Sequence, residues 1–159
     1  MTKLATWLGL SGLIIALDQV TKYWITQTLR FGETIELTAF FNLVLAYNPG
    51  AAFSFLSDQA GWQRWFFVVL ALVVSVWLVV LIRRHVRETW IPLAASMILG
   101  GALGNVIDRV RFGAVVDFIQ WHIAEYYWPA FNVADSAITV GVGLLLWDQF
   151  RPRSAGAHA

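Results

Sequence analysis

The sequence contains no cysteine, which excludes disulfide bonds, a thiol nucleophile and cysteine-ligated metals. Its three histidines, His85, His122 and His158, are scattered without the spacing of a metal-ligand set. The net charge of +1 includes no basic excess of the kind that binds nucleic acid. We therefore expect no metal, no other cofactor and no nucleic-acid partner.

Charged residues are scarce. They make up 13% of the 159 residues, whereas a soluble domain averages about 25%. Hydrophobic residues make up 58%, and the mean hydropathy is +0.64. A helix needs about 20 mostly apolar residues to cross a bilayer, and four runs approach that length, at about 4–25, 65–82, 90–107 and 133–150. The sequence predicts an all-α polytopic membrane protein with four transmembrane helices, a single membrane domain over residues 1–159.

The basic residues indicate the orientation of these spans, because lysine and arginine favour cytoplasmic loops. Three basic clusters fall on one side of a four-span chain: Lys3, the arginines of "RRHVR" at 83–87, and those of "RPR" at 151–153. We expect both termini in the cytoplasm and outer loops at about 29–61 and 109–131. The first run lacks a small-x-small cleavage site, so we interpret it as a retained span and not as a signal peptide.

The two outer loops differ in pattern. In "TIELTAFFNLVLAY" apolar residues recur at every second position, which is the period of a strand. "NPG" at 48–50 then supplies a turn. We expect a small sheet or hairpin in the first outer loop, lying on the outer surface. The second loop contains "EYYWPAF", which is aromatic enough to rest in the membrane interface.

Polar residues within the spans gather toward the outer side, although ionisable groups are costly in a membrane. These residues are Asp18 and Lys22 of the first span, Asn105, Asp108 and Arg109 of the third, Asn132 and Asp135 at the start of the fourth, and Asp117 just beyond the third. Their convergence at one depth predicts a single polar site near the outer leaflet.

Several of these residues also have structural explanations. Asn132 can cap the fourth helix with Asp135 at its N3 position. Asp18 and Lys22, four apart on one helix face, can form a structural ion pair. Asp108 beside Arg109 can simply end the third span, and Gly100 with Gly104 has the spacing of close helix packing.

Asp117 is explained least well by such roles. It lies between two valines and Phe118, and an apolar setting raises the pKa of a carboxyl group. A second carboxylate brought beside it would share its proton, as in aspartic proteases. One member of such a pair can take a proton from water while the other donates to a carbonyl oxygen. This chemistry needs no metal, cysteine, serine or histidine.

At these residues the sequence resembles the lipoprotein signal peptidases, or signal peptidase II. The matching blocks are "LDQVTK", "NPGAAFSF" with Phe53, "GGALGNVIDR", "GAVVDF" and "FNVADSAITVG". Pro49 stands where the family often has threonine, and we expect it to stiffen the turn. The resemblance implies an intramembrane aspartyl peptidase of the bacterial inner membrane. Such an enzyme removes the signal peptide of prolipoproteins on the amino side of a diacylglyceryl-modified cysteine.

The resemblance also implies roles for single residues. Asp117 and Asp135 would be the catalytic pair. The positions implied to bind substrate or support the site are Asn48, Gly50, Asn105, Asp108, Arg109, Asn132, Ala134, Asp18 and Lys22. The implied partners are lipid-modified prolipoproteins and membrane lipids, and we expect a monomer. The strands of the first outer loop would lie over the pocket as a cover.

Two other functions fit an apolar chain with buried charges. A small proton- or ion-coupled transporter would place ionisable groups along a route through the membrane. A non-enzymatic scaffold would use the glycine-rich faces for packing and would need no aspartate in an apolar loop.

Overall fold

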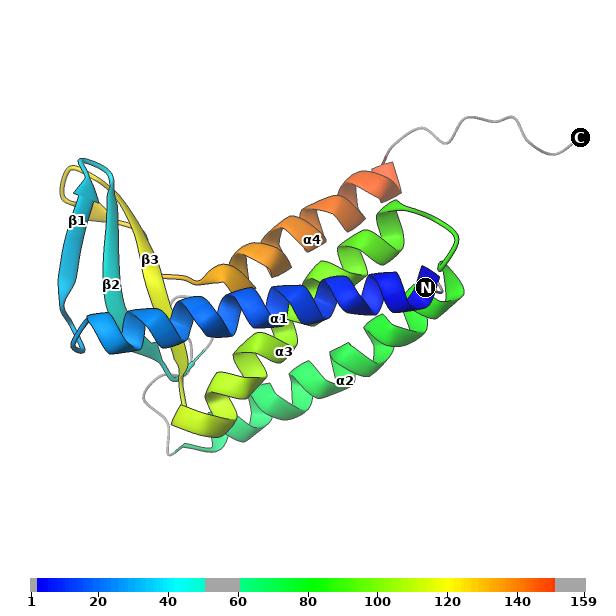
Figure 1. The fold of residues 1–159 in the computed structure, drawn as a ribbon, viewed down its shortest axis with the longest axis horizontal. Helices are drawn as coiled ribbons and strands as arrows, with labels where there is room; N and C mark the ends of the chain where they lie inside the picture. Colours follow the sequence, from blue (N-terminus) through cyan, green and yellow to red (C-terminus); the bar gives the residue numbers. More distant parts are fainter. Residues whose placement is uncertain (1–2, 51–60, 151–159) are drawn as a thin grey trace, which may run out of the picture.

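A computed structural model describes residues 3–50 and 61–150 of the chain. Its helices are α1 (Lys3–Thr28), α2 (Trp62–Arg84), α3 (Trp90–Phe112) and α4 (Val133–Phe150). Its strands are β1 (Thr34–Thr38), β2 (Phe41–Asn48), β3 (Val115–Ile123) and β4 (Tyr126–Tyr127), in an antiparallel sheet of order β1-β2-β3-β4. The sheet lies across one end of the helix bundle, here called the sheet end (Figure 1). The start of α1 and the end of α4 lie at the opposite end.

The helices are apolar outside and partly polar inside. In α1, Ser11, Asp18 and Lys22 are buried, whereas Leu13 and Val20 are more than half exposed. Among the described residues, α1, α2 and α3 are long and apolar enough to cross a membrane. The 18-residue α4 carries Asp135 in its first turn and the buried Asp148 near its last. Exposed apolar faces around a polar interior suit a bundle whose solvent is lipid.

The four described helices match the predicted spans: α4 has the predicted bounds, and α1, α2 and α3 extend beyond theirs. The largest difference is in α3, which continues to Phe112, beyond the predicted end at residue 107. It ends at Gly113, whose left-handed φ of 81° is a conformation that glycine adopts without strain. Asp108 and Arg109 therefore lie inside α3, and the explanation that they simply end the helix is wrong.

The small sheet is confirmed, but half of it was not predicted. The first loop forms the β1–β2 hairpin, whereas the second, predicted only as an aromatic loop, contributes β3 and β4. Asp117 therefore lies in a strand and not in a loop. The predicted apolar face of β2 is interrupted by a bulge, because Leu43 pairs with Ile119 and Ala46 with Asp117. From Leu43 to Ala46 the chain advances three residues along β2, while the paired residues in β3 advance two. The side chains of β2 beyond the bulge therefore point to the opposite face of the sheet.

An apolar cluster fixes the sheet against the end of α1. Ile25 and Leu29 of α1 pack with Leu45 of β2 and with Val116 and Phe118 of β3. All five are at most 5% exposed. Since Val116 and Phe118 flank Asp117 in β3, this packing sets the position of that aspartate.

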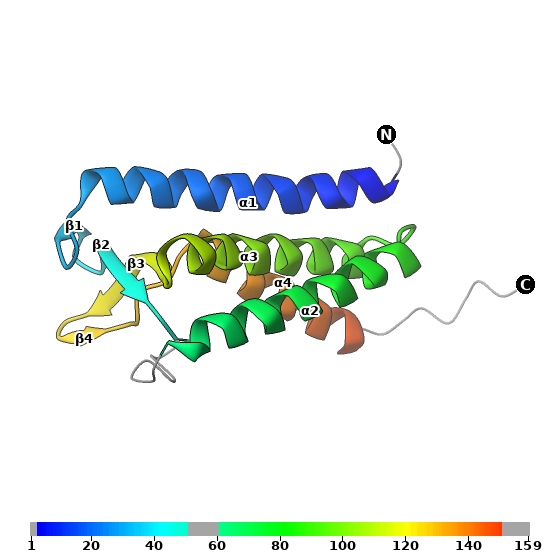
Figure 2. The same ribbon diagram turned by 90° about the horizontal axis from the view of Figure 1, so that it is seen from below.

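Helix α3 is central and packs against the other three helices (Figure 2). The predicted glycine packing is confirmed, because a Cβ at Gly100 would lie 2.8 Å from the Ser11 carbonyl oxygen of α1. On another face of α3, a Cβ at Gly101 would collide with the Ala134 carbonyl oxygen and lie 2.8 Å from Ile138 of α4. Gly101 thus brings α3 close to the first turn of α4, one helical turn before Asn105.

We expect Gly101→Ala to destabilise the protein, because the added methyl group meets backbone that cannot move without separating the two helices. Overpacking of this kind typically costs about 1–3 kcal/mol. The measurement is the thermal unfolding midpoint of the purified protein in detergent. The matched control is Gly143→Ala in α4, where nothing lies within 4 Å of the added Cβ. Equal midpoints for the two variants would contradict the close approach of α3 and α4.

Candidate active site

A buried ammonium group lies at the centre of the polar residues. The Lys22 Nζ is 2.8 Å from Asp18 Oδ2 and 2.7 Å from Asp108 Oδ2. It also donates a hydrogen bond of 3.0 Å to Asn105 Oδ1. Lys22 is 3% exposed and both carboxylates are fully buried. The structural ion pair between Asp18 and Lys22 is confirmed, and it is part of a larger group that joins α1 to α3.

The two carboxylates around Lys22 also bind backbone from the elements that carry the other aspartates. Asp18 Oδ1 accepts from the Ala134 N–H in the first turn of α4, at 2.9 Å. Asp108 Oδ2 accepts from the Val116 N–H of β3, at 3.1 Å. Buried ion pairs are tolerated when further hydrogen bonds satisfy their remaining atoms, as they do here. The group therefore holds α4 and β3 at fixed positions.

Gln19 completes this group, although we did not single it out in the sequence. Its Nε2 donates a hydrogen bond of 2.9 Å to Asp108 Oδ1. The same nitrogen lies 3.2 Å from Asp18 Oδ2 and 3.2 Å from the Gly104 carbonyl oxygen. The available signal was its place in "LDQVTK", as an amide inside an apolar span. Its role depends on α3, which the local sequence does not reveal.

Asn105 connects Lys22 to Asp135. Because an ammonium group only donates, it fixes the Asn105 Oδ1 toward Lys22. The Asn105 Nδ2 then points the other way and donates 2.8 Å to Asp135 Oδ1. The orientation of one amide thus links the buried charge of α1 to the carboxylate of α4.

Asn132 connects the two aspartates. Its Oδ1 accepts from the Asp135 N–H at 2.8 Å, so the predicted N-cap of α4 is confirmed. Its Nδ2 donates to Asp117 Oδ1 at 2.7 Å and to the Val116 carbonyl oxygen at 3.2 Å. Asn132 is fully buried. A single amide side chain therefore caps the helix that carries Asp135 and binds the carboxyl group of Asp117.

Asp117 is 3% exposed, at the end of β3 that meets the helices. Its pKa is raised from the ordinary value of 3.8 to about 7, chiefly by burial and also by the nearby charge of Asp135. Hydrogen bonds from Asn48 and Asn132 and the charge of Lys22 act in the opposite direction. Asp117 is therefore a carboxyl group that gains or loses its proton near neutral pH.

Arg109 ties the end of β2 to α3. Its Nη2 donates 3.0 Å to the Gly50 carbonyl oxygen, and its guanidinium lies 5.2 Å from the centre of the Phe67 ring. The Asn48 Oδ1 accepts from the Gly50 N–H at 3.1 Å. Phe53 lies in residues 51–60, outside the described residues.

Two adjoining cavities reach the aspartates. One, of about 430 Å³, is lined by Asp117 and by Ala46–Pro49 of the first loop. The other, of about 600 Å³, is lined by Asp135 and runs along Ile138 and Val140 of α4. Both share Pro129 and Ala130 as a wall. Within the described residues, no group of His, Asp or Glu side chains could hold a metal ion.

The structure thus brings the predicted site side chains together at one end of an apolar bundle: four carboxyl groups, of which that of Asp135 is half-buried, one ammonium, one guanidinium and three amides. This is the architecture of a multi-pass membrane protein with a polar site, and similarity to known proteins shows the family to which it belongs. Residues 10–151 match the family model described as Signal peptidase (SPase) II.

Curated relatives agree with this match. A lipoprotein signal peptidase of Azoarcus sp. (strain BH72) is 54% identical over 152 residues, covering 96% of this chain and 85% of that protein. A lipoprotein signal peptidase of Burkholderia thailandensis is 49% identical over 155 residues, covering 98% of this chain and 93% of that protein.

Two solved structures described as bacterial membrane enzymes are each 34% identical to this chain, with TM-scores of 0.83 and 0.81. They cover 97% and 94% of this chain, which in turn covers 95% of each. The chain belongs to the signal peptidase II family and is therefore a peptidase.

We expect Lys22→Met to destabilise the fold strongly, because it leaves Asp18 and Asp108 buried without a cation. Removing one partner of a buried ion pair typically costs about 3–5 kcal/mol. The measurement is again thermal unfolding in detergent, with the exposed Lys3→Met in the same helix as the matched control. If the two variants unfolded at the same temperature, Lys22 would not be the support that its contacts indicate.

Proposed function

We propose that this chain is an aspartyl endopeptidase that removes the signal peptide from bacterial prolipoproteins. It would cut on the amino side of a diacylglyceryl-modified cysteine, with Asp117 and Asp135 as its catalytic pair. The observation that carries the proposal is the Asn132 side chain, which binds the carboxyl group of Asp117 and the backbone of Asp135. The names of the relatives, lipoprotein signal peptidases, support the substrate class.

The proposed reaction uses one proton shared by the pair. In the active state Asp117 is protonated and Asp135 is ionised, which agrees with the raised pKa of Asp117. Asp135 removes a proton from a water molecule, and the oxygen of that water attacks the scissile carbonyl carbon. Asp117 donates its proton to the carbonyl oxygen. The tetrahedral intermediate then collapses when a proton passes to the leaving amine and the C–N bond breaks.

The surrounding residues would position the reacting groups. Asn105 donates to Asp135 and leaves its other carboxylate oxygen for water. Asn48 and Arg109 lie where the end of β2 meets the site, and they would bind the peptide backbone of the substrate. The two cavities adjoin at Pro129 and Ala130, so an extended peptide that occupied both would pass Asp117 and Asp135. Asp18, Lys22 and Asp108 would act only as support.

We place all four helices across the bacterial inner membrane as one domain of a monomeric protein. Both termini would be cytoplasmic and the sheet end would lie at the outer surface. A lipid chain on the substrate could then stay in the outer leaflet while the peptide bond reaches water. The transporter alternative fits less well, because the buried ionisable groups of the described residues gather at the sheet end, with Asp148 alone near the opposite end, and so do not follow the length of the bundle. A scaffold would have no use for the carboxyl pair.

We expect Asp117→Asn and Asp135→Asn each to lower cleavage at least about 100-fold, the usual scale for loss of a general acid or base. Amides keep the shape and most hydrogen bonds, so both variants should still fold. The measurement is the gel shift of a lipidated precursor in detergent, with thermal unfolding in parallel. The control is Glu36→Gln on exposed β1. Normal turnover by either site variant would reject the pair.

The rate should also depend on pH. Because Asp117 must donate a proton, cleavage should fall about tenfold per pH unit once the pH exceeds its pKa of about 7. It should fall again in acid, where both carboxyl groups are neutral and neither can accept the proton of water. The measurement is the single-turnover rate across this pH range in folded protein. A constant rate from acid to alkaline solution would be incompatible with the shared proton.

A further inference from the structure

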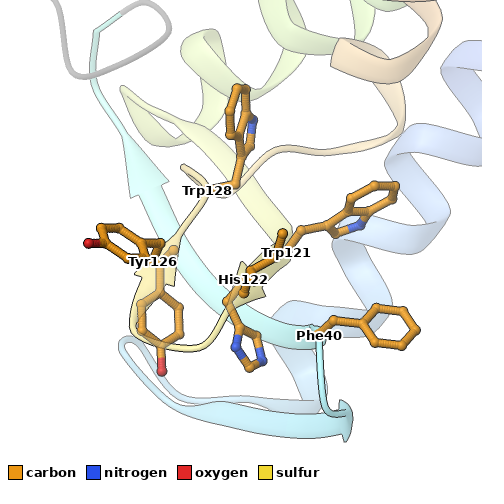
Figure 3. A pocket seen from close by; sticks show the side chains of 7 residues that line it. Phe40, Trp121, His122, Tyr126 and Trp128 are labelled. Atoms are coloured by element: carbon orange, nitrogen blue, oxygen red, sulfur yellow. The ribbon is translucent and has the colours of Figure 1, made fainter.

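A cluster of mostly aromatic and mostly exposed residues lies at the end of the sheet remote from the helices. It consists of Phe40, Trp121, His122, Ile123, Tyr126, Tyr127 and Trp128, around a depression of about 540 Å³ (Figure 3). Tyr126 is 84% exposed, Ile123 80% and Trp121 59%. We refer to these seven residues as the aromatic cluster. An exposed apolar patch of this kind usually marks a binding surface.

The aromatic cluster is a built platform. The His122 N–H donates 3.0 Å to the Phe40 carbonyl oxygen, and the Trp128 N–H donates 2.7 Å to the Trp121 carbonyl oxygen. The His122 and Tyr127 rings stack with their centres 5.1 Å apart. Residues from both loops are therefore held together by the sheet, so the rings keep their exposed positions.

The chemistry of the aromatic cluster fits a lipid surface. Its tyrosine, tryptophan and histidine side chains each combine an apolar ring with a polar group, and no carboxylate, lysine or arginine lines the depression. Rings of this kind collect where hydrocarbon meets headgroups. A binding site for an acidic or basic partner would need charges of the opposite sign, which the lining does not offer.

The position of the aromatic cluster points to the same occupant. Figure 1 shows the turns of both hairpins extending sideways past the start of α4. Trp121 and Trp128 also line the cavity that runs along α4, whose Val140 and Leu146 are more than half exposed. The aromatic cluster therefore continues the lipid-facing surface of the helices onto the sheet.

From these contacts we infer that the aromatic cluster docks the remote end of the sheet onto the headgroup layer of the bilayer beside α4. Asp117 and Ile123 lie on the same strand, about 20 Å apart at the rise of a strand. A sheet held at both ends, by the helices and by the membrane surface, keeps Asp117 at a fixed depth. The inference rests on the membrane placement within the proposed function and is independent of the catalytic pair.

The absence of cysteine allows a direct test. Ile123→Cys and Tyr126→Cys would each carry a nitroxide label, in full-length protein reconstituted into vesicles of phosphatidylethanolamine and phosphatidylglycerol. The references are Val73→Cys on the exposed face of α2 and Glu88→Cys in the turn before α3. Frequent collisions of a nitroxide label with oxygen indicate that the label lies in lipid. Frequent collisions with a water-soluble nickel complex indicate that it lies in water.

We expect the labels at 123 and 126 to favour oxygen over nickel, as the label at 73 does, with the label at 88 showing the reverse. Nickel-dominated collisions at both cluster positions would overturn the inference. The inference would also be overturned if the labels were in water in the protein without precursor and became shielded when an uncleavable precursor was added. The occupant of the aromatic cluster would then be substrate. Precursor cleavage by the same labelled proteins is read separately, so failure of the catalytic proposal leaves the depth reading intact.

Discussion

The buried ammonium of Lys22 is the contact on which the other parts of the site depend. It binds two carboxylates, and each of these accepts a backbone N–H from an element that carries one of the two aspartates proposed as catalytic: Asp18 from α4 and Asp108 from β3. It also fixes the amide of Asn105, which binds Asp135. Desolvating an ammonium is costly, and this cost is offset only in the assembled arrangement. The same contact therefore stabilises the fold and aligns the pair.

The features that could be predicted from the sequence are local ones. The helices follow from apolar runs, the Asp18–Lys22 pair from a spacing of four, and the Asn132 cap from its place before an apolar helix. Strand β3 was missed because Val115–Phe118 are buried on both faces, and such strands show no alternation. Its pairing with β2 is non-local, and so are the contacts of Gln19 with α3 and of Asp108 with α1. Local sequence carries no signal for which helix supplies the partner.

The site combines apolar packing with amide hydrogen-bond donors at the same depth in the bundle. The sheet and α1 supply the apolar packing that fixes the strand of Asp117, through Val116 and Phe118 on either side of it. The amides of Asn105 and Asn132 supply donors that keep both carboxyl groups oriented. Amides carry no charge, so they orient the pair without neutralising it. This division suits the proposed chemistry, which needs two oriented carboxyl groups whose charge is not neutralised.

The most direct test is a structure of the protein bound to a precursor peptide whose scissile amide is replaced by a hydroxyethylene group. The hydroxyl of this group imitates the tetrahedral intermediate of an aspartyl peptidase. The account predicts that it lies within hydrogen-bonding distance of a carboxylate oxygen of Asp117 and of one of Asp135. A bound peptide whose hydroxyl contacts only one of these carboxylates, or neither, would contradict it.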